Sequence, residues 1–169
     1  MSDNATSDDL DDIGPTQRLA ALGIELPDAP APAASYVGHV ITGSWLQTAG
    51  QIALADGALL ATGRVGDTID LATAQACARQ CAINVLAQIR AAGHELENVR
   101  RIVKLTVYVA SASDFTEQHL VANGASDLLG EVFGDAGRHA RSAVGVATLP
   151  MNSPVEVEAL IELGMVVQR

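Results

Sequence analysis

The chain has 169 residues, of which 49% are hydrophobic but only 3% aromatic, so its core must be built from Ala, Val, Leu and Ile. Its 20 acidic and 10 basic residues give a formal net charge of −10, which argues against a nucleic-acid groove because phosphate binding needs a basic surface. No apolar run reaches the roughly 18 residues of a membrane span. We therefore expect neither a nucleic-acid nor a membrane partner.

The N-terminal segment, residues 1–14, is strongly acidic and is expected to be a disordered tail, since it carries no Lys or Arg. It lacks the basic and apolar regions of a signal peptide, which predicts a cytoplasmic location. In that compartment Cys77 and Cys81 are expected to be reduced core residues of a helix. No metal site is predicted, because no further His or Cys lies near them.

The first half of the chain changes character several times. Residues 15–26 predict a short helix, and residues 27–35 a Pro/Ala linker in extended conformation. Residues 36–53 predict two strands joined by a turn at 42–44. An Asp-Gly pair, which is typical of a hairpin turn, then predicts a third short strand at 58–62.

The second half of the chain alternates between segments with the hydrophobic period of a helix and segments with the alternating pattern of a strand. Apolar residues recur every three or four positions over 68–92, which predicts a helix. A strand with one well-buried face follows at 99–111, and then a second helix at 113–133. The last two strands, at 141–148 and 154–163, are expected to form an antiparallel pair across a short turn.

This order predicts an α+β fold in which one mixed sheet carries two helices packed on one face. Residues 36–169 form the single domain, and residues 15–35 are an N-terminal extension and linker. The other sheet face keeps large apolar groups such as Trp45. Because exposed apolar sheet in a protein usually marks an interface, we expect a homo-oligomer with the sheets turned inward.

Arg141 stands at the start of a strand whose next positions on the same face, Ala143, Gly145 and Ala147, are small. The space that they leave suits a planar, bidentate carboxylate receptor. Glu156, on the following strand, is expected near the same end of the sheet, where it can hold a water. The residues alone leave a structural salt bridge between Arg141 and Glu156 as the commoner alternative.

The chain resembles the Rid family (reactive intermediate deaminases, also called YjgF-like or endoribonuclease L-PSP). Four stretches carry the resemblance, in order: YVGHVITGSWLQTAGQI, ARQCAINVLAQIRAAG, VRRIVKLTVYVASASDF and ARSAVGVATLPMNSPVEVEA. The likeness spans about residues 30–163. It implies a chorismate-mutase-like fold and a homotrimer whose sheets face a central barrel, with clefts between the subunits.

The resemblance also implies site residues. In the family, an Arg at the start of the ARS strand binds the carboxylate of a 2-imino acid, and Arg141 matches it. The Glu of the next strand positions the hydrolytic water, and Glu156 matches it. Tyr36, before the first strand, is the second implied catalytic residue, and Gly50 of the T-x-GQ turn is an implied substrate contact.

His119 and Asn123 both fit the substrate-binding Asn that follows the family's DF pair. Two positions depart from the pattern, because Ala49 replaces the usual Ser and Ala143 the usual Cys. The chain therefore resembles a less characterised branch of the family.

The favoured function is a small-molecule imine or enamine hydrolase, a deaminase that acts without cofactor on a carboxylate-bearing reactive intermediate at a subunit-interface cleft. The alternative is a non-catalytic trimeric module that binds a small carboxylate for regulation, which the loss of the family's Ser and Cys favours. Ribonuclease activity is implied only by the historical family label, and the negative net charge counts against it.

Overall fold

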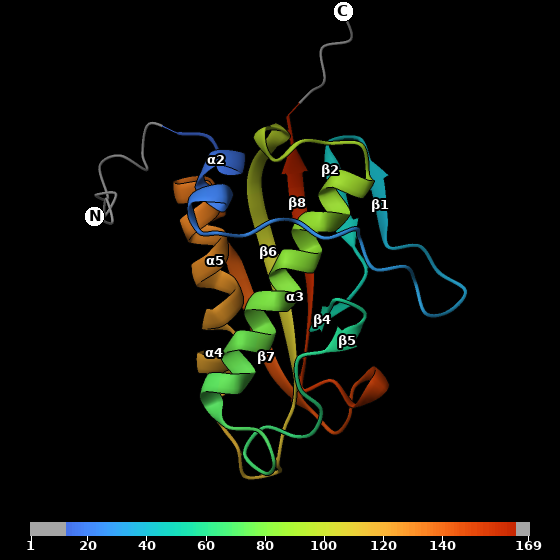
Figure 1. Ribbon diagram of the computed structural model, residues 1–169, viewed down its shortest axis with the longest axis vertical. Helices are drawn as coiled ribbons and strands as arrows, with labels where there is room; N and C mark the ends of the chain where they lie inside the picture. Colours follow the sequence, from blue (N-terminus) through green and yellow to red (C-terminus); the bar gives the residue numbers. More distant parts are fainter. Residues whose placement is uncertain (1–12, 165–169) are drawn as a thin grey trace, which may run out of the picture.

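The computed structural model describes residues 13–164, so the predicted tail lies almost wholly outside the described residues. The molecule has two layers, a main sheet and a layer of helices that covers one of its faces (Figure 1). This confirms the predicted α+β class. Ile13 and Gly14, the last residues of the predicted tail, contact the first described helix, since the Ile13 carbonyl accepts from Arg18 Nε at 3.0 Å and Gly14 N donates to Gln17.

The main sheet has the strand order β1-β2-β8-β6-β7, with β3 beside β8. Parallel pairing of β6 with β7 and antiparallel pairing elsewhere make it a mixed sheet, as predicted. Its strands are β1 (His39–Thr42), β2 (Trp45–Thr48), β3 (Gln51–Ile52), β6 (Val99–Ala110), β7 (Ala140–Val146) and β8 (Val155–Leu163).

The longest helix, α3, packs across the middle of the sheet with α5 beside it (Figure 1). Asp70 caps α3 by accepting a hydrogen bond from Thr73 N at 2.7 Å, and Gly93 follows its end with a φ of 82°. The described helices are α2 (Pro15–Ala21), α3 (Leu71–Ala91), α4 (Gln118–Val121) and α5 (Asn123–Phe133), with short 3₁₀ turns at Leu96–Asn98, Gly134–Gly137 and Pro150–Asn152.

The core lies between the helices and the sheet. Along β8 every second residue is buried, so that one face of the strand contacts the helices and the other is turned away. Cys77 and Cys81 of α3 are buried and unpaired, as predicted. Burial raises the pKa of the Cys77 thiol to about 11 and that of Cys81 well above its usual range, so both are protonated core groups.

Two elements differ from the prediction. The third strand is only β5 (Ala58–Leu59), and it pairs with β4 (Leu54–Ala55) in a separate two-stranded sheet. The second helix begins at Gln118 instead of 113, because the chain first makes a turn after the end of β6, in which Phe115 N donates to the Ala112 carbonyl at 3.1 Å. Ser113 and Asp114 are therefore not helix caps.

The predicted antiparallel pairing of the last two strands is wrong. β7 and β8 lie on either side of β6, to which β7 is parallel and β8 antiparallel. The connection between them turns through Met151 and Asn152, whose φ values are 56° and 61°, and crosses the end of β6. Both edges of β6 are therefore paired, and the short connection from β7 to β8 does not make a hairpin.

The sheet face opposite the helices exposes apolar side chains. By strand register Val40, Trp45 and Val144 lie on this face, and they are 52%, 43% and 44% exposed. They are the surface from which the sequence predicts a homo-oligomer, and the assembly itself stays a prediction. None of the helices between residues 13 and 164 has the length and apolarity to cross a membrane.

Candidate functional site

The side chain of Arg141 is held by three acceptors. Its Nη1 donates to Asn123 Oδ1 at 3.1 Å and to Ser126 Oγ at 2.9 Å, and its Nη2 donates to the His119 carbonyl at 2.9 Å. Asn123 and Ser126 are three residues apart in α5, so they lie on the same face of the helix. The structure thus brings Arg141, Asn123 and His119 together. Asn123 contributes its side chain, whereas His119 contributes only its backbone oxygen.

His139 contacts Ser126 and so helps to fix the side chains around Arg141. Its Nδ1 lies 2.6 Å from the Gly137 carbonyl, which accepts only, so Nδ1 carries the proton. Nε2, 3.0 Å from Ser126 Oγ, then accepts from the Ser126 hydroxyl, whose oxygen in turn accepts from Arg141. Burial lowers the pKa of His139, and the Arg141 charge lowers it further against the opposing effect of the Gly137 hydrogen bond. His139 is therefore neutral at pH 7.

A shallow pocket of about 310 Å³ opens beside Arg141. Its lining includes Ser126, Arg138 and His139 and contains no Asp or Glu. A cationic lining without acidic groups favours an anionic ligand, and a guanidinium fixed by neutral acceptors keeps its full positive charge for that ligand.

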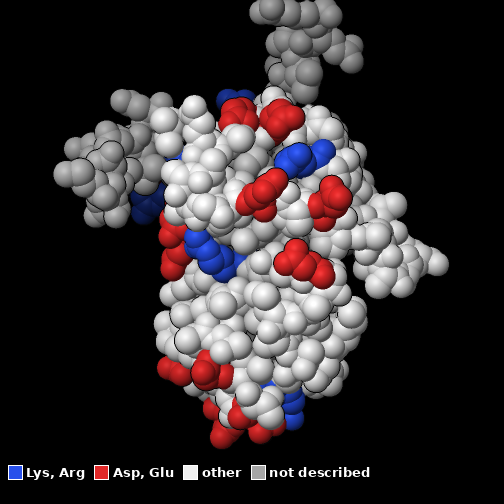
Figure 2. Space-filling model, in the orientation of Figure 1, with Lys and Arg blue, Asp and Glu red and all other residues white. Residues whose placement is uncertain are grey.

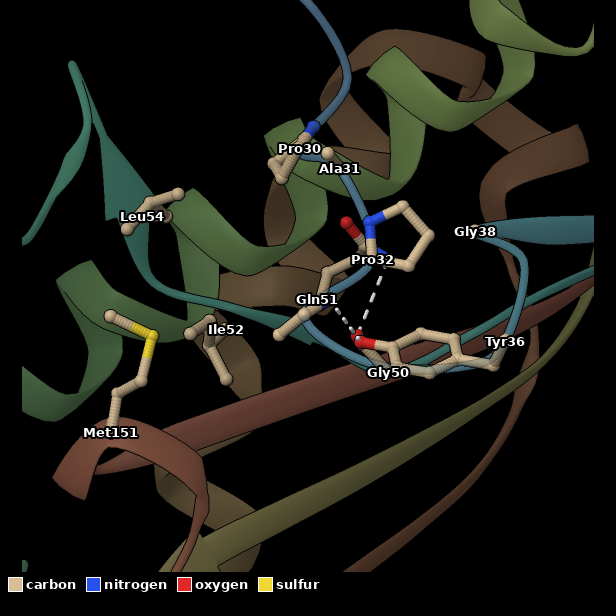
Figure 3. Close-up of a pocket in the computed structure, with 11 residues that line it drawn as sticks. Pro30, Ala31, Pro32, Tyr36, Gly38, Gly50, Gln51, Ile52, Leu54 and Met151 are labelled. Atoms are coloured by element: carbon tan, nitrogen blue, oxygen red, sulfur yellow. Dashed lines mark hydrogen bonds between the residues drawn. The ribbon is translucent and has the colours of Figure 1, made fainter.

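Glu156 belongs to a second group of residues. A Cβ on Gly50 would overlap the Glu156 carboxylate, so glycine at this position permits the close approach of the backbone to that side chain. Gly50 and Tyr36 line a hollow of about 90 Å³ together with Met151 and the extended segment 30–33 (Figure 3). Tyr36 Oη accepts a hydrogen bond from Ala33 N at 3.3 Å. The structure thus brings Gly50 close to Glu156 on one side and into the same hollow as Tyr36 on the other, while Glu156 itself does not line that hollow.

The electrostatics of this group are those of a poised base. Burial raises the pKa of the Glu156 carboxyl, and the neighbouring Glu158 carboxylate raises it further. Tyr108 Oη donates to Glu158 at 3.2 Å, and burial together with that carboxylate raises the Tyr108 pKa. A half-buried carboxylate with a raised pKa accepts a proton from water more readily than a solvated one.

Within one chain the two groups are separate. Arg141 pairs in register with the buried Leu105, on the helix side of the sheet, and its partners belong to α4 and α5. Glu156 pairs with Tyr108, on the opposite face. The described ion pairs do not join Arg141 and Glu156, so the salt-bridge interpretation is wrong. The expectation that both lie near one end of the sheet is also corrected, because Arg141 is level with Leu105 and Glu156 with Tyr108, three positions further along β6.

The sequence interpretation missed two residues, Ser126 and His139. Ser126 could have been found from its spacing, because a helix that presents Asn123 to Arg141 also presents the residue three positions later. His139 lies in the basic GRHAR run, which gives no sign of a buried contact with Ser126. Among residues 13–164, no cluster of three or more His, Cys, Asp or Glu side chains is arranged to hold a metal ion.

The fold and these two residue groups define a small α+β protein with a pocket at one sheet edge that Arg138 and Arg141 line. Residues 16–163 match the family model described as "YjgF/chorismate_mutase-like, putative endoribonuclease". The chain belongs to this family, the YjgF or Rid family.

The chain is similar to several known proteins. Protein TCP17 of Trypanosoma cruzi is 51% identical over 146 residues, covering 86% of this chain and 91% of the relative. The crystal structure of Atu1372 from Agrobacterium tumefaciens, described as of unknown function, has a TM-score of 0.83 at 47% identity and covers 88% of this chain and 92% of its own. A 2-iminobutanoate/2-iminopropanoate deaminase of Salmonella typhimurium is 34% identical over 137 residues, covering 81% and 94%.

Proposed function

We propose that the protein is an imine or enamine hydrolase that releases ammonia from a small, carboxylate-bearing reactive intermediate. The observation that carries the proposal is the Arg141 guanidinium, fixed by three uncharged acceptors beside a pocket without acidic residues. The relative named as an imino acid deaminase supports the reaction type. Only the chemistry of Arg141 and Glu156 is needed, since imines hydrolyse in water and positioning alone gives a useful acceleration.

In the proposed reaction, Arg141 binds the substrate carboxylate through two parallel N–H donors. Glu156 accepts a proton from a water as the water oxygen bonds to the imine carbon, the C=N π electrons move to nitrogen, and Glu156 returns the proton to that nitrogen. The resulting carbinolamine collapses as its hydroxyl proton passes through Glu156 to the nitrogen, so that the C=O bond forms and the C–N bond breaks. Ammonia leaves, and the product is a 2-oxo acid when the substrate is a 2-imino acid.

We further propose that the complete site forms between two copies in a homotrimer. One copy supplies Arg141 with Asn123, and its neighbour supplies Glu156 with Gly50 and Tyr36. This is supported by the position of the two groups on opposite faces of one sheet, and by the exposed apolar residues of the face that carries Glu156.

Ammonia release from an enzymatically generated 2-imino acid tests the proposal. Arg141→Lys keeps the charge but loses the planar fork, and we expect affinity to fall about ten- to a hundredfold, the equivalent of one charge-assisted hydrogen bond. Glu156→Gln should keep ligand binding and lose turnover, because an amide does not accept the proton of the water. Wild-type protein that does not accelerate ammonia release, with a ligand still bound in an Arg141-dependent way, would support the regulatory module instead.

That second function is favoured by one observation. Ala49 and Ala143 stand where the deaminase pattern has Ser and Cys, so the polar groups around the carboxylate receptor are reduced while Arg141 is kept. The same two variants distinguish the functions, because the module requires Arg141 alone and the hydrolase requires both residues.

Nucleic acid is not a substrate in this proposal. The net charge of −10 opposes phosphate binding, and on the face shown in Figure 2 the acidic and basic side chains of the described residues are scattered without a continuous basic stretch. RNA cleavage by nuclease-free protein that depends on Arg141 would contradict it.

A further inference from the structure

A third pocket lies beyond the carboxyl ends of the parallel strands β6 and β7. It has a volume of about 430 Å³, which is the size of small-molecule sites. Arg141, Glu156 and Tyr36 do not line this pocket, so it is distinct from the candidate site that contains them. Its polar and aromatic lining comes from Arg64, Ser111, Ser113, Phe115 and Gln118, with Gly145 beside them.

The backbone that carries Arg64 is fixed to the sheet. Val65 N donates to the Ala110 carbonyl at 2.8 Å, and the Val65 carbonyl accepts from Ala112 N at 2.9 Å, so this segment runs parallel to the end of β6. Val65 itself is fully buried. The guanidinium of Arg64 is therefore attached to a rigid part of the fold, which a binding residue requires.

The Arg64 side chain is only partly satisfied. Nη2 donates to the Ser111 carbonyl at 2.9 Å, whereas Nε is buried and has no hydrogen-bond partner among the described residues. Neither the pocket lining nor the ion pairs of residues 13–164 give Arg64 a carboxylate. A buried donor without an acceptor costs free energy, and in a chain of net charge −10 a guanidinium without a carboxylate is available to an external anion.

The other polar groups suit the same ligand. Gln118 Nε2 lies 3.3 Å from Ser111 Oγ and donates to the Phe115 carbonyl at 2.7 Å, so the Ser111 hydroxyl can still donate its own hydrogen. A Cβ on Gly145 would lie 2.8 Å from both Gln118 Nε2 and Ser111 Oγ, so glycine keeps this floor of the pocket open. Hydroxyl and guanidinium donors beside the Phe115 ring form a site for a charged head and a small apolar body.

We propose that this pocket binds a small oxyanion, either a carboxylate or a phosphate, through the Arg64 guanidinium and the Ser111 hydroxyl. The proposal is independent of deaminase activity. Because the pocket is separate from Arg141, each chain has two anion sites, and binding at one leaves the residues of the other in place.

The test uses ¹⁵N-labelled Arg141→Ala protein, which lacks the first anion site. Sodium phosphate and, separately, sodium propionate are titrated at constant ionic strength while the backbone amides of Ser111 and Gly145 are followed. We expect saturable shifts at these amides and none at Gly130, which lies in the Arg141 pocket. The anion that binds more tightly identifies the head group, phosphate or carboxylate.

Two further changes are made in the same Arg141→Ala protein. Arg64→Gln should weaken binding at least about tenfold, as expected for a lost charge-assisted hydrogen bond. Arg79→Gln is the matched control, because it removes a guanidinium that is paired with Glu131 on the surface, and it should leave the affinity unchanged. Equal affinities in the two proteins, or no saturable shift with either anion, would overturn the proposal.

If Arg64→Gln fails to fold, Gly145→Val tests the anion site instead. The new side chain displaces the flexible end of Gln118 and fills the pocket floor, while a β-branched residue suits the strand. Binding should again fall at least about tenfold with Arg64 intact. Unchanged binding in a folded Gly145→Val protein would show that the anion binds elsewhere.

Discussion

Arg141 and Glu156 lie on opposite faces of one sheet, on strands that β6 separates. A single ligand cannot contact both within one chain, so a hydrolase that uses both must combine two copies. In a ring, each site then takes its Arg from one chain and its Glu from the next.

This arrangement predicts complementation between two inactive variants. Arg141→Ala and Glu156→Gln chains are co-expressed with different affinity tags, and mixed oligomers are isolated through both tags. In a mixed trimer roughly one site in three receives an intact Arg141 and an intact Glu156, so about a third of the wild-type rate of ammonia release should return. Sedimentation of the same sample checks the trimer. Mixed trimers as inactive as the parents would show that the two residues do not meet across an interface.

Adding a methyl group at Gly50 should lower the activity strongly while the protein still folds. Gly50→Ala must displace the Glu156 carboxylate, so we expect ammonia release to fall at least about tenfold and the protein to lose about 1–3 kcal/mol of stability. Gly130→Ala is the matched control for stability alone, because Gly130 lines the Arg141 pocket. Nothing lies within 4 Å of its new Cβ, and in the helix the change should be neutral or stabilising by up to about 1 kcal/mol. Denaturant unfolding of both variants and rate measurements on Gly50→Ala check this. Full activity in Gly50→Ala would remove Glu156 from the site.

The raised pKa of Glu156 predicts that replacing this carboxylate with a neutral side chain stabilises the protein, and that the size of this effect depends on pH. The ionised carboxylate is disfavoured in the folded state, so it lowers stability above the folded pKa and has no such effect below its ordinary value of 4.5. Glu156→Gln should therefore melt at a higher temperature than wild type at pH 7 and at nearly the same temperature at pH 4. Thermal melts at the two pH values check the sign. A variant less stable than wild type at pH 7 would mean that the charge is stabilised by a partner.

Most of the fold follows from local patterns. The 3.6-residue period gave α3 within a few residues of its ends, because its buried face is continuous and Asp70 and Gly93 mark its boundaries. Periodicity cannot give strand partners, since β6 could accept β8 on either edge without changing the alternation of either sequence. The wrong neighbour for β7 followed from assuming that a short connection makes a hairpin.

The site was predicted unevenly for the same reason. The residue types came from the resemblance, but which of them meet depends on the sheet order and on the face of each strand. Asn123 and Ser126 approach Arg141 because β7 is an edge strand beside α5, and that is a property of the tertiary fold. The Gly50–Glu156 contact likewise arises from pairing of β3 with β8, which are about a hundred residues apart in the sequence.

The hydrogen-bond chain from Gly137 through His139 and Ser126 to Arg141 yields the last prediction. His139 is neutral in the fold with a lowered pKa, so the unfolded chain binds a proton more readily near the ordinary value of 6.5. The stability that depends on neutral His139 is complete above that value and is lost as the pH falls below it toward the folded pKa. The free energy of unfolding of the wild type should therefore fall between pH 7.5 and pH 5, and His139→Gln should abolish this part of the decrease.

His119→Gln serves as the control for that measurement, because the His119 side chain is exposed and Arg141 uses only its backbone oxygen. Its pH dependence should match the wild type. Ser126→Ala removes the link between His139 and Arg141, so carboxylate affinity should drop severalfold while the fold persists, because the guanidinium loses one of its three acceptors. If the affinity of Ser126→Ala equals that of the wild type, Arg141 is positioned by Asn123 and the His119 carbonyl alone.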